Sequence, residues 1–66
     1  MDQTIQLPPP LLKVPEVAGV LNCSKAYIYQ LIKRKEIPSV QIGSAVRIRQ
    51  EDLERYIAEN LQGVDA

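Results

Sequence analysis

The residues of this 66-residue chain best suited to chemistry are its cations, and they gather in the middle of the sequence. Residues 24–49 hold six basic side chains against one acidic, a net charge of +5, whereas the other residues hold two basic against seven acidic, a net charge of −5. A polyanion meets this local field rather than the overall charge of zero. The partition favours nucleic acid as a partner, with a solvated basic face as the plainer alternative.

Composition argues against an enzyme or a metalloprotein. The chain has no His, the general base that enzymes use most often, and its single Cys can neither form an internal disulfide nor find a second zinc ligand. We expect Cys23 to be a buried small hydrophobic residue. Glu51 and Asp52 are expected in the first turn of a helix, where carboxylates complement the helix dipole. No catalytic residue, metal or cofactor is therefore expected.

Length and hydropathy indicate one small domain. The 45% hydrophobic content is ordinary for a globular protein, and no apolar run reaches the roughly 18–20 residues of a membrane span. The start of the chain lacks the pattern of a secretory signal, so we expect a cytoplasmic protein without a membrane partner. Residues 1–10, with the run Pro8-Pro9-Pro10, are expected to be a flexible tail, residues 11–61 the domain, and residues 62–66 a frayed end.

Helical periodicity predicts two short helices around a tight turn. The first is expected at about residues 15–21 and closed by Asn22, since Asn tolerates the left-handed conformation. The second is expected at about residues 25–35, with Ser24 as its N-cap. Its core-facing residues are Ile28, Leu31 and Ile32. Turning the helix by about 100° per residue leaves these residues outside: Lys25, Ala26, Tyr27, Gln30, Lys33 and Arg34.

The apolar period then changes from helical to alternating. Residues 40–42 and 46–48 are predicted strands around Gly43, which is typical of a β-hairpin with glycine at its tip. Arg47 and Arg49 would share one face of the second strand. A third helix is expected at about residues 51–60, with an apolar stripe of Leu53, Tyr56, Ile57 and Leu61. This order describes a mainly α fold with a small β-hairpin, a winged helix-turn-helix.

The chain resembles the excisionase-type helix-turn-helix family, relatives of the MerR DNA-binding domain, in the stretches LLKVPEVAGVLNCSKAYIYQLIKRKEIPSVQIG and VRIRQEDLERYI. The resemblance covers residues 11–57, about 70% of the chain. It implies a winged-helix fold, insertion of the second helix into the major groove, and wing contact with an adjacent minor groove or backbone. Family members are small phage, plasmid or transposon proteins that bend attachment-site DNA and direct an integrase toward excision, or transcriptional regulators.

Some positions depart from this family pattern. Relatives often carry Thr or Ser before the first helix, where Lys13 stands, and Gly where Asn22 and Lys35 stand. Many have a basic wing tip, whereas Ser44 is small and neutral. We therefore expect the wing to bind through backbone N–H groups and two arginines, Arg47 and Arg49.

The candidate DNA-binding residues lie on the second helix and on the wing. On the helix they are Ser24, Lys25, Ala26, Tyr27, Gln30, Lys33 and Arg34. On the wing and its flanks they are Lys35, Gly43, Ser44, Arg47 and Arg49. Gln can pair bidentately with adenine, Lys can reach guanine acceptors, and the Ala methyl can touch a thymine methyl. The leading hypothesis is a sequence-specific binder of double-stranded DNA that acts as an excisionase, with an integrase and further copies of the chain as partners.

Two alternatives stay open. A small transcriptional regulator from a mobile element would use the same interface, and the location of its DNA site would separate the two functions. A protein-interaction module without DNA binding is the alternative of a different class. Its docking surface would be the acidic third helix, which is expected to expose Glu51, Glu54 and Glu59.

Overall fold

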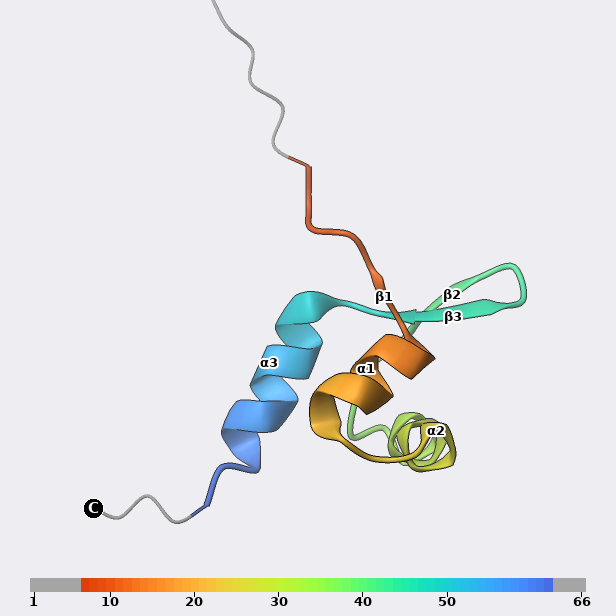
Figure 1. Ribbon diagram of the computed structural model, residues 1–66. Helices are drawn as coiled ribbons and strands as arrows, with labels where there is room; N and C mark the ends of the chain where they lie inside the picture. The colour runs from red at the N-terminus through yellow and green to blue at the C-terminus, as the bar shows by residue number, and fades with distance from the viewer. Residues whose placement is uncertain (1–6, 63–66) are drawn as a thin grey trace, which may run out of the picture.

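The first two helices end in the same left-handed turn. The computed structural model describes residues 7–62, and in it α1 spans Val14–Leu21 and α2 spans Lys25–Lys33 (Figure 1). Asn22 follows α1 with φ 56°, as predicted, and Lys35 follows α2 with φ 65°. The N–H groups of Asn22 and Cys23 donate to carbonyls of the last turn of α1 at 3.2 and 3.0 Å. The N–H groups of Lys35 and Glu36 donate in the same way to carbonyls of α2 at 3.0 and 2.9 Å. This turn ends α2 two residues earlier than predicted.

A three-stranded antiparallel sheet lies beside the helices, with its strands in the order β1-β3-β2. The predicted hairpin is formed by β2 (Val40–Ile42) and β3 (Ala45–Ile48), with Gly43 at φ 61° in the turn. The third strand, β1 (Leu12–Lys13), pairs with the other edge of β3. A strand of two residues shows no alternation, which is why the sequence predicts the hairpin but not β1.

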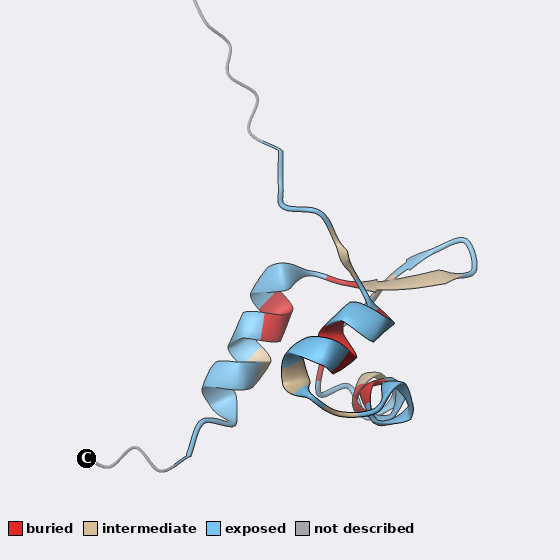
Figure 2. Cartoon of the chain, viewed as in Figure 1, coloured by how far each residue is buried: buried red, intermediate tan, exposed pale blue. Residues whose placement is uncertain are grey.

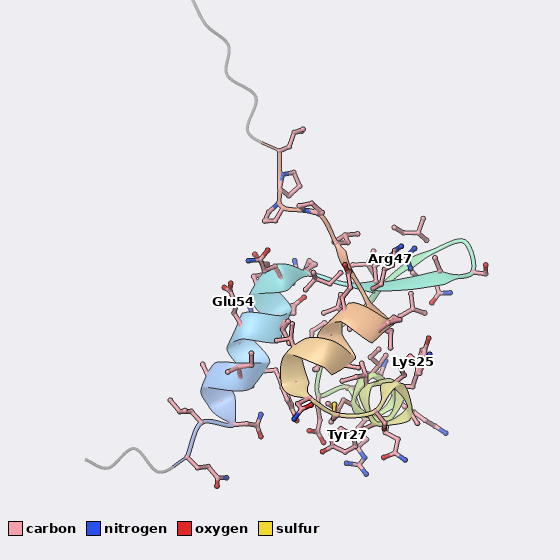
Figure 3. All side chains as sticks on the ribbon, in the orientation of Figure 1. Lys25, Tyr27, Arg47 and Glu54 are labelled. Carbon is pink, nitrogen blue, oxygen red and sulfur yellow. The ribbon has the colours of Figure 1, made fainter. Side chains whose placement is uncertain are left out.

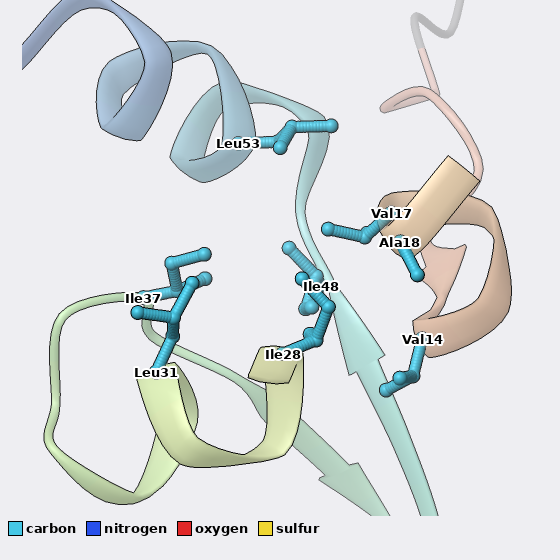
Figure 4. Close-up of a cluster of buried hydrophobic side chains, with 8 residues drawn as sticks. All are labelled: Val14, Val17, Ala18, Ile28, Leu31, Ile37, Ile48 and Leu53. Carbon is cyan, nitrogen blue, oxygen red and sulfur yellow. The ribbon is translucent and has the colours of Figure 1, made fainter. Parts of the chain in front are cut away.

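Helices and sheet share one apolar core, which α1 organises by packing against α2, β1 and β3. Figure 4 shows its eight buried side chains, each at most 5% exposed: Val14, Val17, Ala18, Ile28, Leu31, Ile37, Ile48 and Leu53. Ile37 lies in the loop before β2, outside any periodic segment, so sequence patterns do not predict its burial. Cys23 packs against this core but is only partly buried, less than expected.

The last helix, α3 (Gln50–Glu59), is attached to the core through its first half. Leu53 is buried and Tyr56 is partly buried, as predicted. Ile57 and Leu61, which were predicted to continue the same apolar stripe, are 41% and 66% exposed, so this part of the stripe does not join the core. Figure 2 shows this change along α3, where buried and partly buried residues in the earlier turns give way to exposed residues in the later ones.

The helix pair, the sheet and α3 make a winged helix-turn-helix, as predicted, with the β2–β3 hairpin as its wing. Residues 7–10 are exposed and have no regular structure. Residues 1–6 of the expected tail and residues 63–66 of the expected frayed end lie outside the described residues. Among the helices of residues 7–62, none has the length and apolar character of a membrane span.

Candidate nucleic-acid interface

The orientation of α2 is set at its start by Ser24 and along its length by two buried side chains. The Ser24 hydroxyl accepts a hydrogen bond from the N–H of Tyr27 at 3.1 Å, as an N-cap does. Ile28 and Leu31 are fully buried, so the opposite side of the helix faces away from the core. The helix residues expected on that side are all exposed: Lys25, Ala26, Tyr27, Gln30, Lys33 and Arg34.

Tyr27 lies at the border between this exposed side and α3. It is 43% exposed. Burial, and after it the neighbouring Tyr27, raises the pKa of Tyr56 on α3, so the two tyrosines lie close together. Tyr27 therefore lies near α3 while much of its side chain is accessible to a ligand.

The cations of the candidate interface differ in whether a carboxylate accompanies them. Arg34 Nη1 lies 3.8 Å from Glu36 Oε2, and both side chains are well exposed. Four other candidate cations have no carboxylate within 4.0 Å in the described part of the chain: Lys25, Lys33, Lys35 and Arg47. Figure 3 shows Lys25 and Arg47 on the side of the molecule away from Glu54 of α3.

The wing tip is the two-residue turn Gly43-Ser44 between β2 and β3. The carbonyl of Gly43 accepts a hydrogen bond from Gln41 Nε2 at 3.1 Å, and Ser44 is exposed. Arg47 is partly buried on β3, where its Nη1 donates to the carbonyl of Val46 at 3.0 Å. The tip therefore offers backbone groups and small side chains, and Arg47 supplies the positive charge of the wing.

Arg49 does not share a strand face with Arg47, and that prediction is wrong. Since β3 ends at Ile48, Arg49 instead takes the N-cap position of α3. Its Nε and Nη2 lie 2.6 and 3.0 Å from the two carboxylate oxygens of Asp52, and its Nη1 lies 3.1 Å from Glu51 Oε2. The Arg49 guanidinium is thus held by two carboxylates of α3.

Asp52 is the buried charged residue of the described chain, at 2% exposed. Arg55 Nη1 is its second partner, at 3.3 Å. The hydrogen bond from Arg49 holds the pKa of Asp52 below its ordinary value although burial opposes this, and Asp52 in turn raises the pKa of Arg49. Sequence reasoning assigned Asp52 only to the helix dipole. The missed signal is the i, i+3 spacing of Arg49, Asp52 and Arg55.

A groove of about 340 Å³ lies between the proline segment and the start of α3. Its lining is partly apolar and partly acidic: Pro8, Pro9, Leu11, Arg49, Gln50, Glu51 and Glu54. Within residues 7–62 no group of three His, Cys, Asp or Glu side chains is placed to hold a metal ion.

A family model described as a helix-turn-helix domain matches residues 11–61. The match covers most of the chain and includes α1, α2, the wing and α3. The chain belongs to this family, and the helix-turn-helix is a class of DNA-binding domain.

Two kinds of relative are similar to parts of the chain. Uncharacterized protein YvgK of Bacillus subtilis (strain 168) is 42% identical over 43 residues, which are 65% of this chain and 14% of YvgK. "Putative DNA-binding protein Rv0500A" of Mycobacterium tuberculosis (strain ATCC 25618 / H37Rv) is 40% identical over 38 residues, which are 58% of this chain and 49% of that protein. The matched segments therefore span half or less of these relatives. No solved structure gives a significant match.

Proposed function

We propose that this domain recognises a specific sequence of double-stranded DNA by inserting α2 into the major groove. This proposal rests on the exposed side of α2, where Lys25 and Lys33 lie on either side of Gln30 in sequence. Neither lysine has a carboxylate partner within residues 7–62. In helix-turn-helix proteins, residues near the N-terminus of the second helix contact base edges. The relative described as a putative DNA-binding protein supports the same assignment.

The residues of α2 divide into base-reading and phosphate-binding groups in this proposal. Gln30 pairs with adenine, Lys25 reaches guanine acceptors, and Ala26 touches a thymine methyl. Phosphates and sugars are contacted from α2 and its ends by Ser24, Tyr27, Lys33, Arg34 and Lys35, and from the wing by Gly43, Ser44 and Arg47. Arg49, because two carboxylates hold its guanidinium, acts by fixing the wing against α3 rather than by neutralising a phosphate.

The resemblance to excisionases leads us to place this binding in the excision of a mobile element. The protein would bind and bend attachment-site DNA, in the cytoplasm at the nucleoid, so that an integrase acts in the direction of excision. The integrase, or a neighbouring copy of the chain, would dock on the acidic exposed residues of α3, which are Glu51, Glu54 and Glu59. A transcriptional regulator would bind DNA through the same surface of α2.

Selection of preferred sites from randomised duplexes, followed by single variants, tests the proposal. Gln30→Ala and Lys25→Ala should each relax the preference at one base pair and cost about 1–3 kcal/mol on the selected site, whereas Lys33→Gln should weaken all sequences alike. Identical behaviour of the two classes of variant would overturn the role of α2. A selected site beside an integrase core site supports a role in excision, and a site over a promoter supports transcriptional regulation. If the protein binds no DNA, the alternative of a protein-interaction module is supported instead.

A further inference from the structure

Lys13 and Arg47 lie directly opposite each other on the outer face of the sheet. The register of β1 and β3 pairs Lys13 with Arg47 and Leu12 with Ile48. Ile48 is fully buried and Leu12 packs against the core, so the alternation of side chains turns Lys13 and Arg47 to the other face. Opposite residues of an antiparallel pair have Cβ atoms about 4.5–5.5 Å apart, so the two cationic side chains leave the sheet side by side.

The charge of this pair is not compensated within residues 7–62. No carboxylate lies within 4.0 Å of the charged group of Lys13 or of Arg47. The neighbouring Glu16 directs its Oε1 to the backbone N–H of Lys13, at 2.7 Å, and Arg47 uses one of its N–H groups on the carbonyl of Val46. Like charges directly opposite each other destabilise a strand pair, and a bound anion removes that cost.

We infer that Lys13 and Arg47 together hold one backbone phosphate of the bound DNA, at a site separate from α2. This inference rests on the proposed function and adds Lys13 of β1 to the interface. Lys13 directly precedes α1, the helix that crosses the DNA backbone in helix-turn-helix proteins. Guanidinium supplies directed donors to phosphate oxygens and ammonium supplies a compact charge, so the two side chains complement each other around one phosphate.

The pairing is tested first without DNA, by thermal unfolding at low ionic strength in a buffer free of phosphate. Lys13→Gln relieves the repulsion and should raise the Tm by about 1–5 °C. Inorganic phosphate should then raise the Tm of the wild type more than that of Lys13→Gln. An unchanged Tm in the variant, together with an equal response to phosphate, would overturn the pairing.

The phosphate contact is tested by the slope of log K against log salt for duplex DNA. The double variant Lys13→Gln/Arg47→Gln should lower that slope by about 0.9, the value for one phosphate, and two separate contacts would lower it by about 1.8. Lys33→Gln is the control on α2, and its effect should add to that of the double variant. Circular dichroism of each variant checks that it is folded.

The outcomes separate this inference from the proposed function. If the wild type shows no salt-dependent DNA binding, the proposed function is wrong. The assignment of a DNA phosphate to Lys13 and Arg47 is then wrong as well. If the wild type binds and Lys33→Gln lowers the slope while the double variant does not, the inference alone is overturned. A slope lowered by about 1.8 would overturn the single shared phosphate.

Discussion

Arg49 Nε lies 2.6 Å from Asp52 Oδ2, and this contact ties the end of the wing to the start of α3. The second oxygen of the same carboxylate accepts from Arg49 Nη2 at 3.0 Å, which makes the pair bidentate. Leu53, the next residue, is the buried apolar anchor of α3. The Arg49–Asp52 ion pair and the buried Leu53 side chain are therefore adjacent in α3. Together they fix the direction in which α3 leaves the sheet.

Acid should destabilise the domain through Asp52. Its pKa is lower in the folded protein than in the unfolded chain, so its stabilising effect is present above the ordinary aspartate pKa of about 4 and is lost as the pH falls through the folded value. Asp52→Asn should lower the Tm at neutral pH and flatten its decline below about pH 4. Glu59→Gln, at the exposed end of α3, is the control and should decline like the wild type. An equally steep decline in Asp52→Asn would contradict this role.

Replacement of Arg49 should affect folding more than DNA binding. Arg49→Gln removes both carboxylate contacts and should lower the Tm. The slope of log K against log salt should stay as in the wild type, since the guanidinium neutralises Asp52 and Glu51 rather than a phosphate. A slope lowered by about 0.9, as we expect for Lys33→Gln, would show instead that Arg49 contacts the DNA backbone.

Glycine at position 35 should stabilise the free domain. Lys35 has φ 65°, a conformation that costs a residue with a Cβ atom about 1–2 kcal/mol and costs glycine little. Lys35→Gly should raise the Tm by about 4–8 °C for each kcal/mol gained. Lys35→Ala removes the same charge but keeps the Cβ, so it should show no such rise. Equal Tm values for the two variants would argue against strain at this turn.

Truncations along α3 should show where the helix is attached. Leu53→Ala removes a buried side chain and should cost about 2–5 kcal/mol of unfolding free energy. Ile57→Ala, one turn later and 41% exposed, should change it by less than about 0.5 kcal/mol. Urea titration followed by circular dichroism measures both. Comparable losses would mean that the second half of α3 packs against another part of the molecule.

The sequence predicts the elements with a strong local signal and misses those that depend on long-range contacts. The Ser24 cap, the left-handed Asn22 and the turn at Gly43 each follow from the chemistry of one residue, and all three are present. β1 is too short to show a pattern, and its partner β3 is more than thirty residues away. The amphipathic pattern of α3 likewise does not indicate that the core ends between Leu53 and Ile57.

In the candidate site, too, features with a local sequence signal were predicted and features that depend on long-range contacts were not. Exposure of the α2 residues follows from helical periodicity, because the positions of Ile28 and Leu31 fix the opposite side. The environment of Arg49 depends on the point at which β3 gives way to α3, and a boundary shifted by one residue changes its neighbours from a strand face to two carboxylates. The candidate role of Lys13 follows only from the register of β1, which pairs it with Arg47.

The most direct test of the central claim is fluorescence anisotropy of a labelled, mixed-sequence duplex of about 25–30 base pairs, or two to three helical turns, titrated with the protein at several salt concentrations. Saturable binding should weaken steeply with salt, by about 0.9 in log K per log salt for each phosphate contacted, and Lys33→Gln should lower this slope. Absence of binding at low salt, or a slope near zero, would contradict DNA recognition through the basic side of α2.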